Sequence, residues 1–181
     1  MKSKPLFTLI LSLLSYCLFA QEAITPRPSP TAIITMKYED TYVKVTYSQP
    51  HKRNRTIFGT LVPYGQVWRT GANEATEITL TGDLLINETD TLKAGTYSIF
   101  TIPSSDKWTI IINGELGQWG AYNYNPQADV LRFEVPTLNV KPGVTWEPFT
   151  MAFEQSNEKA KLAMMWDKTK VEIPITFIDN E

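Results

Sequence analysis

Polar and apolar residues alternate at every second position over most of this chain. The pattern is strict near the C-terminal end, where Val171, Ile173, Ile175 and Phe177 are separated by single residues of other kinds. A period of two is typical of a β-strand with one buried face, because successive side chains point to opposite sides of a sheet. No stretch of about 12 residues after the first 20 carries the apolar stripe of an amphipathic helix. The sequence therefore predicts an all-β fold.

Turn-forming residues divide the alternating segments into about eight to ten expected strands. The clearest of these segments are 96–103, 108–113, 130–135, 146–154, 161–166 and 171–177. We interpret the acidic stretch 87–90 as a plain β-turn rather than a calcium-binding loop. The expected architecture is one domain at 32–181, a two-sheet β-sandwich of the jelly-roll or immunoglobulin-like type, with a β-barrel as the alternative.

The N-terminal segment has the layout of a secretory signal peptide. Lys2 and Lys4 precede the apolar run 6–19, and the small residue Ala20 ends it. A basic start, a short apolar core and a small final residue are typical of a leader that is removed. We expect the signal peptide to span 1–20 and the protein to be exported, either to the periplasm or out of the cell.

The single cysteine of the chain lies inside this leader. Cys17 follows the bulky Tyr16, whereas a lipoprotein cleavage site has a small residue there, so a lipoprotein is not expected. The mature chain then has no thiol for a disulfide or a metal. With His51 as the single histidine, no metal site and no cofactor are predicted. A proline-rich linker is expected at 21–31.

The charge balance argues against nucleic acid as a partner. The net charge of the chain is −2, and removal of the leader lysines makes it about −4. Lys52, Arg53 and Arg55 form a basic cluster that is too short to attract a phosphate backbone by itself. No apolar segment after the leader is long enough to span a membrane. The sequence leaves the oligomeric state open.

The segment 48–76 holds the side chains best suited to ligand binding. They are an indole, two guanidinium groups, an amide and a carboxylate, namely Arg55, Trp68, Arg69, Asn73 and Glu74. An indole face can stack on a sugar ring while the polar groups form hydrogen bonds with its hydroxyls. Alternatively, Trp68 belongs to the core and Arg69 is buried against Glu74 or Glu77, which would stabilise the fold.

A second loop, 117–126, is rich in aromatic and amide residues and is too long for a tight hairpin turn. Its Trp119 and Tyr122 could form a stacking surface next to Trp68. They could equally plug the open end of the domain. We include both residues in the predicted binding set.

No catalytic residue is assigned. His51 lies next to Lys52 in a basic loop, and no glycine-flanked serine could partner it. A glycosidase-like hydrolase would need two carboxylates about 5 to 10 Å apart, such as Glu74 with Glu77 or Asp129. Glu74 and Glu77 would face opposite sides of one strand, which argues against that pair.

Several short sequence motifs, in a consistent order, resemble those of the bacterial family named domain of unknown function 2911. The motifs lie at 47–50, 55–59, 61–65, 67–76, 94–98 and 118–122. The likeness covers Ile33 to Val135. Asn54 stands where the family usually has glycine, and both residues tolerate a positive φ, so the resemblance implies the same turn. It also implies an exported bacterial envelope protein, and it brings no activity and no catalytic residue.

The sequence thus predicts an exported bacterial protein of unknown function that binds a polar, glycan-like small ligand. The binding residues would be Arg55, Trp68, Arg69, Asn73, Glu74, Trp119 and Tyr122. One alternative is a structural or partner-binding envelope protein whose arginine and tryptophan cluster stabilises the fold. The other is a carboxylate-dependent hydrolase.

Overall fold

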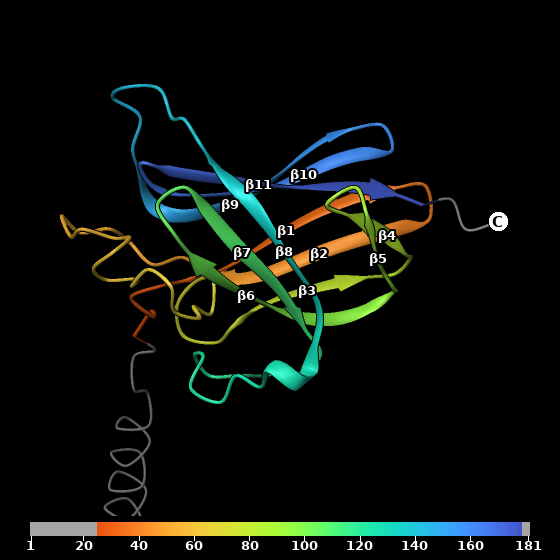
Figure 1. Ribbon diagram of the computed structural model, residues 1–181, viewed down its shortest axis with the longest axis horizontal. Coiled ribbons are helices and arrows are strands. Elements are labelled where there is room, and N and C mark those ends of the chain that lie inside the picture. Colours follow the sequence, from red (N-terminus) through yellow and green to blue (C-terminus); the bar gives the residue numbers. More distant parts are fainter. Residues whose placement is uncertain (1–24, 179–181) are drawn as a thin grey trace, which may run out of the picture.

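The structure is a computed structural model that describes residues 25–178. The predicted signal peptide at 1–20 lies outside these residues. In Figure 1 the described chain forms one body of strands, with long loops at its left and lower ends.

The described residues form eleven strands and one short 3-10 helix, η1 (Pro126–Ala128). The strands are β1 (Thr31–Tyr38), β2 (Thr41–Ser48), β3 (Thr76–Leu80), β4 (Leu84–Ile86), β5 (Asp90–Leu92), β6 (Gly95–Pro103), β7 (Lys107–Asn113), β8 (Asp129–Leu138), β9 (Trp146–Ser156), β10 (Lys159–Asp167) and β11 (Thr169–Phe177). The all-β prediction is confirmed. The structure has more strands than the eight to ten expected because it includes the short hairpin β4–β5, whose strands are joined by the predicted turn. A strand of three residues is too short to show alternation in the sequence.

The strands belong to one antiparallel sheet in the order β1-β2-β3-β6-β7-β8-β11-β10-β9, and β4 joins β5 to the far end of β11. The sheet curls until its two edges meet, as the orange β1 and β2 lying beside the blue β9 show in Figure 1. The strands therefore form a nearly closed barrel, which is the alternative that the sequence left open.

Hydrogen bonds beyond the end of β2 close one end of the barrel. Phe149 N donates to Pro50 O at 2.8 Å, and Lys52 N donates to Glu147 O at 2.7 Å. Nearer the other end, Gln155 Nε2 donates to Lys37 O at 3.1 Å. These hydrogen bonds join the two edges of the sheet.

The inward faces of the strands form the core, as alternation predicts. Towards one end of the barrel the core contains a group of five aromatic rings, each of which contacts at least two of the others: Phe58, Trp68, Trp108, Phe149 and Trp166. Trp68 and Trp166 are stacked, with ring centroids 6.0 Å apart and an angle of 16° between the planes. Aromatic rings of this size supply a large share of the buried apolar area.

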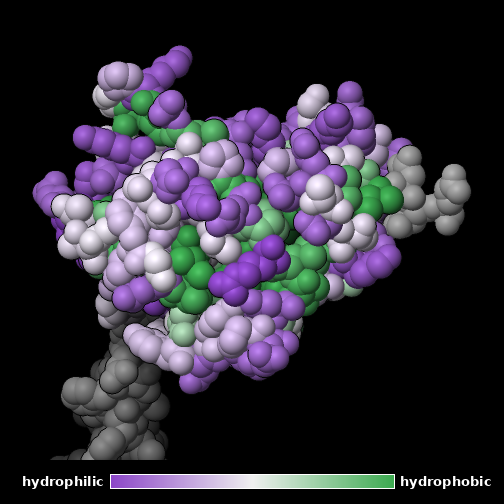
Figure 2. Space-filling view, in the orientation of Figure 1, coloured by the Kyte–Doolittle hydropathy of each residue, from purple (hydrophilic) through white to green (hydrophobic). Residues whose placement is uncertain are grey.

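A smaller apolar cluster lies on the outer face of the sheet. Ala75, Phe100 and Ile111 are buried there, beneath a cover that includes Ala121 and Tyr124 from the loop after β7. This loop lies at the bottom of Figure 1, and in Figure 2 its surface is mostly pale, which indicates intermediate hydropathy. Among residues 25–178 no helix has the length and apolar character needed to cross a membrane.

The proline-rich segment 25–30 contains neither helix nor strand, yet hydrogen bonds attach it to the barrel. Gln49 N donates to Pro30 O at 2.9 Å, and Arg53 Nη2 donates to Pro28 O at 3.3 Å. The segment thus lies along the loops at one end of the barrel.

Candidate functional site

The candidate site is built on an excursion from the sheet. Trp68 and Thr101 exchange backbone hydrogen bonds of 2.7 and 2.9 Å. Trp68 therefore pairs with β6 on the same side as β3, just beyond the first residue of β3. Thr76, the first residue of β3, donates its N–H to Arg69 O at 3.1 Å. Residues 69–75 are therefore looped out between two points that remain hydrogen-bonded to the sheet.

Backbone conformations inside this excursion are unusual. Thr70 and Asn73 have positive φ values of 55° and 59°. Asparagine tolerates this region, but for a β-branched residue it is strained by about 1 to 3 kcal/mol. Two hydrogen bonds hold Thr70 in this strained conformation. Thr76 Oγ1 donates to Thr70 O at 2.7 Å, and Thr70 Oγ1 donates to Thr101 Oγ1 at 3.2 Å. Strain held in this way is a common feature of binding sites.

The two loops that the sequence singled out are hydrogen-bonded to each other. Ala75 N donates to Gln118 O at 2.8 Å, and Gly120 N donates to Asn73 O at 3.0 Å. The excursion 69–75 and the aromatic loop after β7 thus form one surface, at the lower left of Figure 1.

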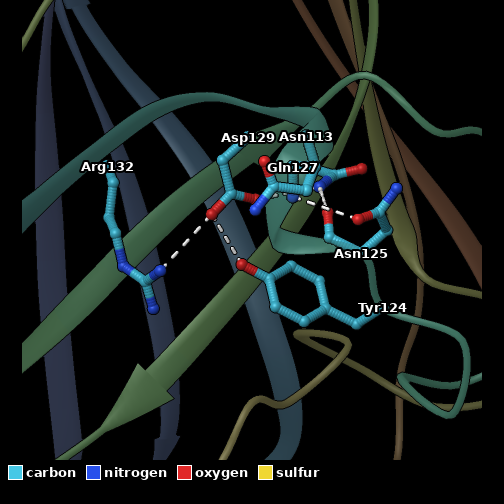
Figure 3. A network of polar contacts seen from close by, with 6 residues as sticks. All are labelled: Asn113, Tyr124, Asn125, Gln127, Asp129 and Arg132. Carbon is cyan, nitrogen blue, oxygen red and sulfur yellow. Dashed lines mark hydrogen bonds and ion pairs between the residues drawn. The ribbon is translucent and has the colours of Figure 1, made fainter.

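A polar network below the aromatic loop holds that loop in place (Figure 3). Asn113 Nδ2 donates to Asn125 O and to Asp129 Oδ1, both at 2.9 Å, and the Tyr124 hydroxyl donates to Asp129 Oδ2 at 2.6 Å. Burial, together with the hydrogen bond to Asp129, raises the pKa of Tyr124 to about 12. This network was not predicted from the sequence, although the amide and tyrosine content of the loop was a signal for it.

Two adjoining hollows lie beside the excursion. We call the first the arginine hollow; its volume is about 320 Å³, and its lining includes Ser29, Arg55, Trp68, Arg69, Asn73 and Trp166. We call the second the tyrosine hollow; its volume is about 380 Å³, and its lining includes Leu61, Pro63, Val67, Trp68, Arg69 and Tyr122. Because Leu61, Trp68 and Arg69 line both, the two hollows meet at these side chains.

The lining of the hollows carries positive charge and no carboxylate from the described residues. Arg55 donates to Lys52 O at 3.0 Å and to His51 O at 2.6 Å, which orients its guanidinium group. Arg69 Nε is buried and has no hydrogen-bond partner among the described residues. An arginine in such a position is the main electrostatic feature of the site.

The structure brings five of the seven predicted binding residues to the hollows and places two elsewhere. Arg55, Trp68, Arg69 and Asn73 line the arginine hollow, and Tyr122 lines the tyrosine hollow. The other two, Glu74 and Trp119, form a backbone bridge with each other and line neither hollow. Ser29 lines the arginine hollow but was not predicted, since nothing in a proline-rich segment indicates where it folds back.

Trp68 belongs mainly to the core. Its side chain is stacked on Trp166 and contacted at its edges by Phe58 and Phe149, and the residue is only 8% exposed. Its Nε1 donates to Gly71 O at 3.0 Å. By contrast, Tyr122 is 83% exposed, so Tyr122 is the aromatic ring that a ligand can stack on.

The ion pair that the alternative hypothesis required does not form between the predicted partners. Glu74 accepts two hydrogen bonds from Arg27 Nη1, at 2.8 and 2.9 Å, and this contact lowers the pKa of Glu74. Glu77 instead accepts a hydrogen bond from Gly117 N at 2.9 Å. Arg69 is therefore not paired with either glutamate.

Glu74 and Glu77 do not lie on one strand, so the prediction that they face opposite sides of it was wrong. Glu74 precedes β3, which begins at Thr76, so the two-residue period does not apply to it. Both carboxylates line a separate hollow of about 370 Å³ together with Arg27.

A family model described as "Protein of unknown function (DUF2911)" matches residues 29–175. The chain belongs to this family. The match extends beyond the range Ile33 to Val135 that the sequence motifs covered, so β9, β10 and nearly all of β11 are part of the family domain. Comparison with curated proteins and with solved structures gave no match.

Proposed function

We propose that this DUF2911 protein binds a small polar, glycan-like ligand in the arginine and tyrosine hollows. The observation that carries the proposal is the meeting of the two hollows at Arg69, with Asn73 on one side and the exposed Tyr122 ring on the other. Each hollow lies near the lower end of the size range for small-molecule sites, so together they suit about one or two sugar rings.

The side chains around the hollows offer complementary contacts to a sugar. The Tyr122 ring can stack on the apolar face of a pyranose. The Asn73 amide nitrogen is occupied by Ser29 O at 3.1 Å and Ser48 Oγ at 3.4 Å, which leaves its Oδ1 to accept from a ligand hydroxyl. Arg55 and Arg69 supply donors, so each type of sugar group has a counterpart.

The test is calorimetric titration with a panel of monosaccharides and disaccharides. We expect Tyr122→Ala to weaken binding at least about tenfold, because the stacking ring is lost. Leu116→Ala is the matched control, since Leu116 is exposed on the same loop and lines neither hollow. Absence of binding by every sugar, or equal binding by wild type and Tyr122→Ala, would reject the proposal.

The geometry gives less support to the hydrolase alternative. A general acid works best with a raised pKa, whereas the hydrogen bonds from Arg27 lower the pKa of Glu74. If Glu74→Gln abolished turnover of a polysaccharide, the hydrolase would replace the binding proposal.

We also propose that the protein is exported after removal of its leader. The support is the sequence of basic, apolar and small residues at 1–20. Mass spectrometry of the protein recovered from fractionated cells should give Gln21 as its first residue. An intact Met1 in the cytoplasmic fraction would contradict export.

A further inference from the structure

The strongest unexplained polar group in the described residues is the guanidinium of Arg69. Two buried side-chain nitrogens have no hydrogen-bond partner there, Arg69 Nε and Trp108 Nε1. Trp108 is enclosed in the aromatic core, whereas Arg69 lines both hollows. A ligand in the hollows can therefore contact the guanidinium of Arg69, a group whose Nε has no hydrogen-bond partner among the described residues.

The carboxylates next to Arg69 in the sequence are already engaged. Glu74 is held by Arg27 and Glu77 by the backbone of Gly117. Arg69 forms no ion pair with any described residue, and Arg55 adds a second positive charge to the same hollow. An uncompensated pair of arginines in a concave, partly buried site selects for an anionic group.

The terminal nitrogens of Arg69 suggest the shape of that group. A guanidinium presents one N–H on each of its two terminal Nη groups as parallel donors, which match the two oxygens of a planar carboxylate. Gly120 has a φ of +71°, and a side chain there would begin 3.7 Å from Arg69 Nη1 and only 2.8 Å from the Tyr122 ring. Gly120 therefore lets the guanidinium and the ring lie close to each other.

We infer that the ligand is an acidic sugar whose carboxylate binds the two terminal Nη groups of Arg69 while its ring stacks on Tyr122. This inference rests on the proposed function and names the ligand class for the same site. Arg55 strengthens the attraction without contributing the paired donors. The ligand class is that of uronic acids and the oligosaccharides that contain them.

The first experiment compares acids with matched neutral sugars. Glucuronate, galacturonate and mannuronate are titrated beside their methyl esters and beside glucose, galactose and mannose. We expect at least one acid to bind about tenfold or more tightly than its own ester, because the ester keeps the ring and loses the charge. Binding should weaken as salt is raised.

The second experiment tests the paired donors. Arg69→Lys keeps the charge but loses the planar donor pair, so we expect binding of the preferred acid to fall about tenfold or more. Arg132→Lys is the control, because Arg132 contacts Asp129 outside both hollows. In a nitrogen-15 spectrum the Arg69 Nη–H signals, assigned by their loss in Arg69→Lys, should move when the acid is added.

The outcomes separate the two proposals. If esters and neutral sugars bind as tightly as the acids, the acidic-sugar inference is overturned and the binding function stands. If no sugar of either kind binds, the binding function itself fails. Stronger binding of glucose 6-phosphate than of every uronate, or unmoved Nη signals in the bound state, would also overturn the carboxylate assignment.

Discussion

Trp68 and Arg69 are neighbours in the sequence but lie in different environments. Consecutive residues of an extended chain point to opposite sides, so Trp68 enters the aromatic core while Arg69 turns to the hollows. Both residues belong to the same family motif, so the sequence could not show which of them stabilises the core and which faces a ligand. Burial separates them, because only a side chain at the surface can contact a ligand.

Replacement of Trp68 should therefore affect stability first. We expect Trp68→Ala to lower the free energy of unfolding by about 3 to 5 kcal/mol, because it leaves a cavity among four other rings. Trp119→Ala, at a residue that is 58% exposed, should change it by no more than about 0.5 kcal/mol. Urea unfolding followed by circular dichroism measures both, and equal effects would contradict this placement.

Replacement of Arg69, unlike that of Trp68, should have little effect on the free energy of unfolding. Because its buried Nε has no partner in the described residues, we expect Arg69→Met to leave the free energy of unfolding within about 0.5 kcal/mol of wild type or to raise it. Thr76→Val, which removes the 2.7 Å hydrogen bond to Thr70 O, should cost about 1 to 3 kcal/mol. A loss above about 2 kcal/mol in Arg69→Met would show that Arg69 has a stabilising partner.

The elements around the site differ in how they are held. The excursion 69–75 is anchored at both ends to the sheet, whereas the aromatic loop depends on the network of Asn113, Tyr124 and Asp129 beneath it (Figure 3). The network lies away from the hollows and contributes no lining residue to them. It acts on the site by positioning Gly120 and Tyr122.

The Tyr124 hydroxyl should make the stability of this loop sensitive to alkali. Folding raises the pKa of Tyr124, so its contribution is complete below about pH 10 and is lost as the pH rises through about 12. We expect Tyr124→Phe to cost about 1 to 3 kcal/mol at neutral pH. In a spectrophotometric titration the variant should lack the last tyrosine to ionise, and an unchanged final phase would contradict the assignment.

Acid should weaken the contact between β10 and β11 through Glu172. Lys161 and Lys170 lie at 2.8 and 2.7 Å from its carboxylate and lower its pKa, Lys161 having the larger effect. Because folding lowers this pKa, the contribution is present above the unfolded value of about 4.3 and is lost as the pH falls through the lower folded value.

The effect should be modest, at most about 1 kcal/mol, since both lysines are partly exposed. Glu172→Gln should reduce the loss of unfolding free energy between about pH 7 and about pH 3. Glu134→Gln is the control, because Glu134 and its partner Lys107 are both about half exposed. Equal acid sensitivity in wild type and Glu172→Gln would show that Glu172 contributes nothing.

At the scale of the whole molecule, the closure of the barrel brings the site together. Residues after β2 pair with β9, and this pairing places Pro50 and Arg55 near Trp166 of β10 around the arginine hollow. Segments more than 100 residues apart thus share one wall. A flat two-sheet arrangement would not require this contact.

Tyr47 gives a direct test of closure. Its hydroxyl accepts from Met151 N at 2.9 Å, which joins β2 to β9 across the seam. We expect Tyr47→Phe to cost about 1 to 3 kcal/mol, because a buried backbone N–H loses its partner. Tyr42→Phe on the outer side of β2 should be nearly neutral, and hydrogen exchange should be faster at Met151 only in Tyr47→Phe.

Much of the fold could be predicted because strand formation here depends on local pattern. The alternation in 171–177 corresponds to β11, and the positive φ of Asn54 agrees with the turn that its residue type favours. The choice between sandwich and barrel could not be made, because it depends on whether β9 reaches β1 and β2, and alternation carries no information about strand order.

The sequence by itself determined the strand content, the family and the set of polar and aromatic residues from which the site is made. Only the tertiary structure decided that Glu74 binds Arg27, that Trp68 is enclosed by other rings, and that Arg69 lies beside Tyr122 with no partner for its Nε within residues 25–178. The physical reason is that hydrophobic period is a property of neighbours along the chain, whereas charge compensation and burial depend on contacts between segments that only folding brings together.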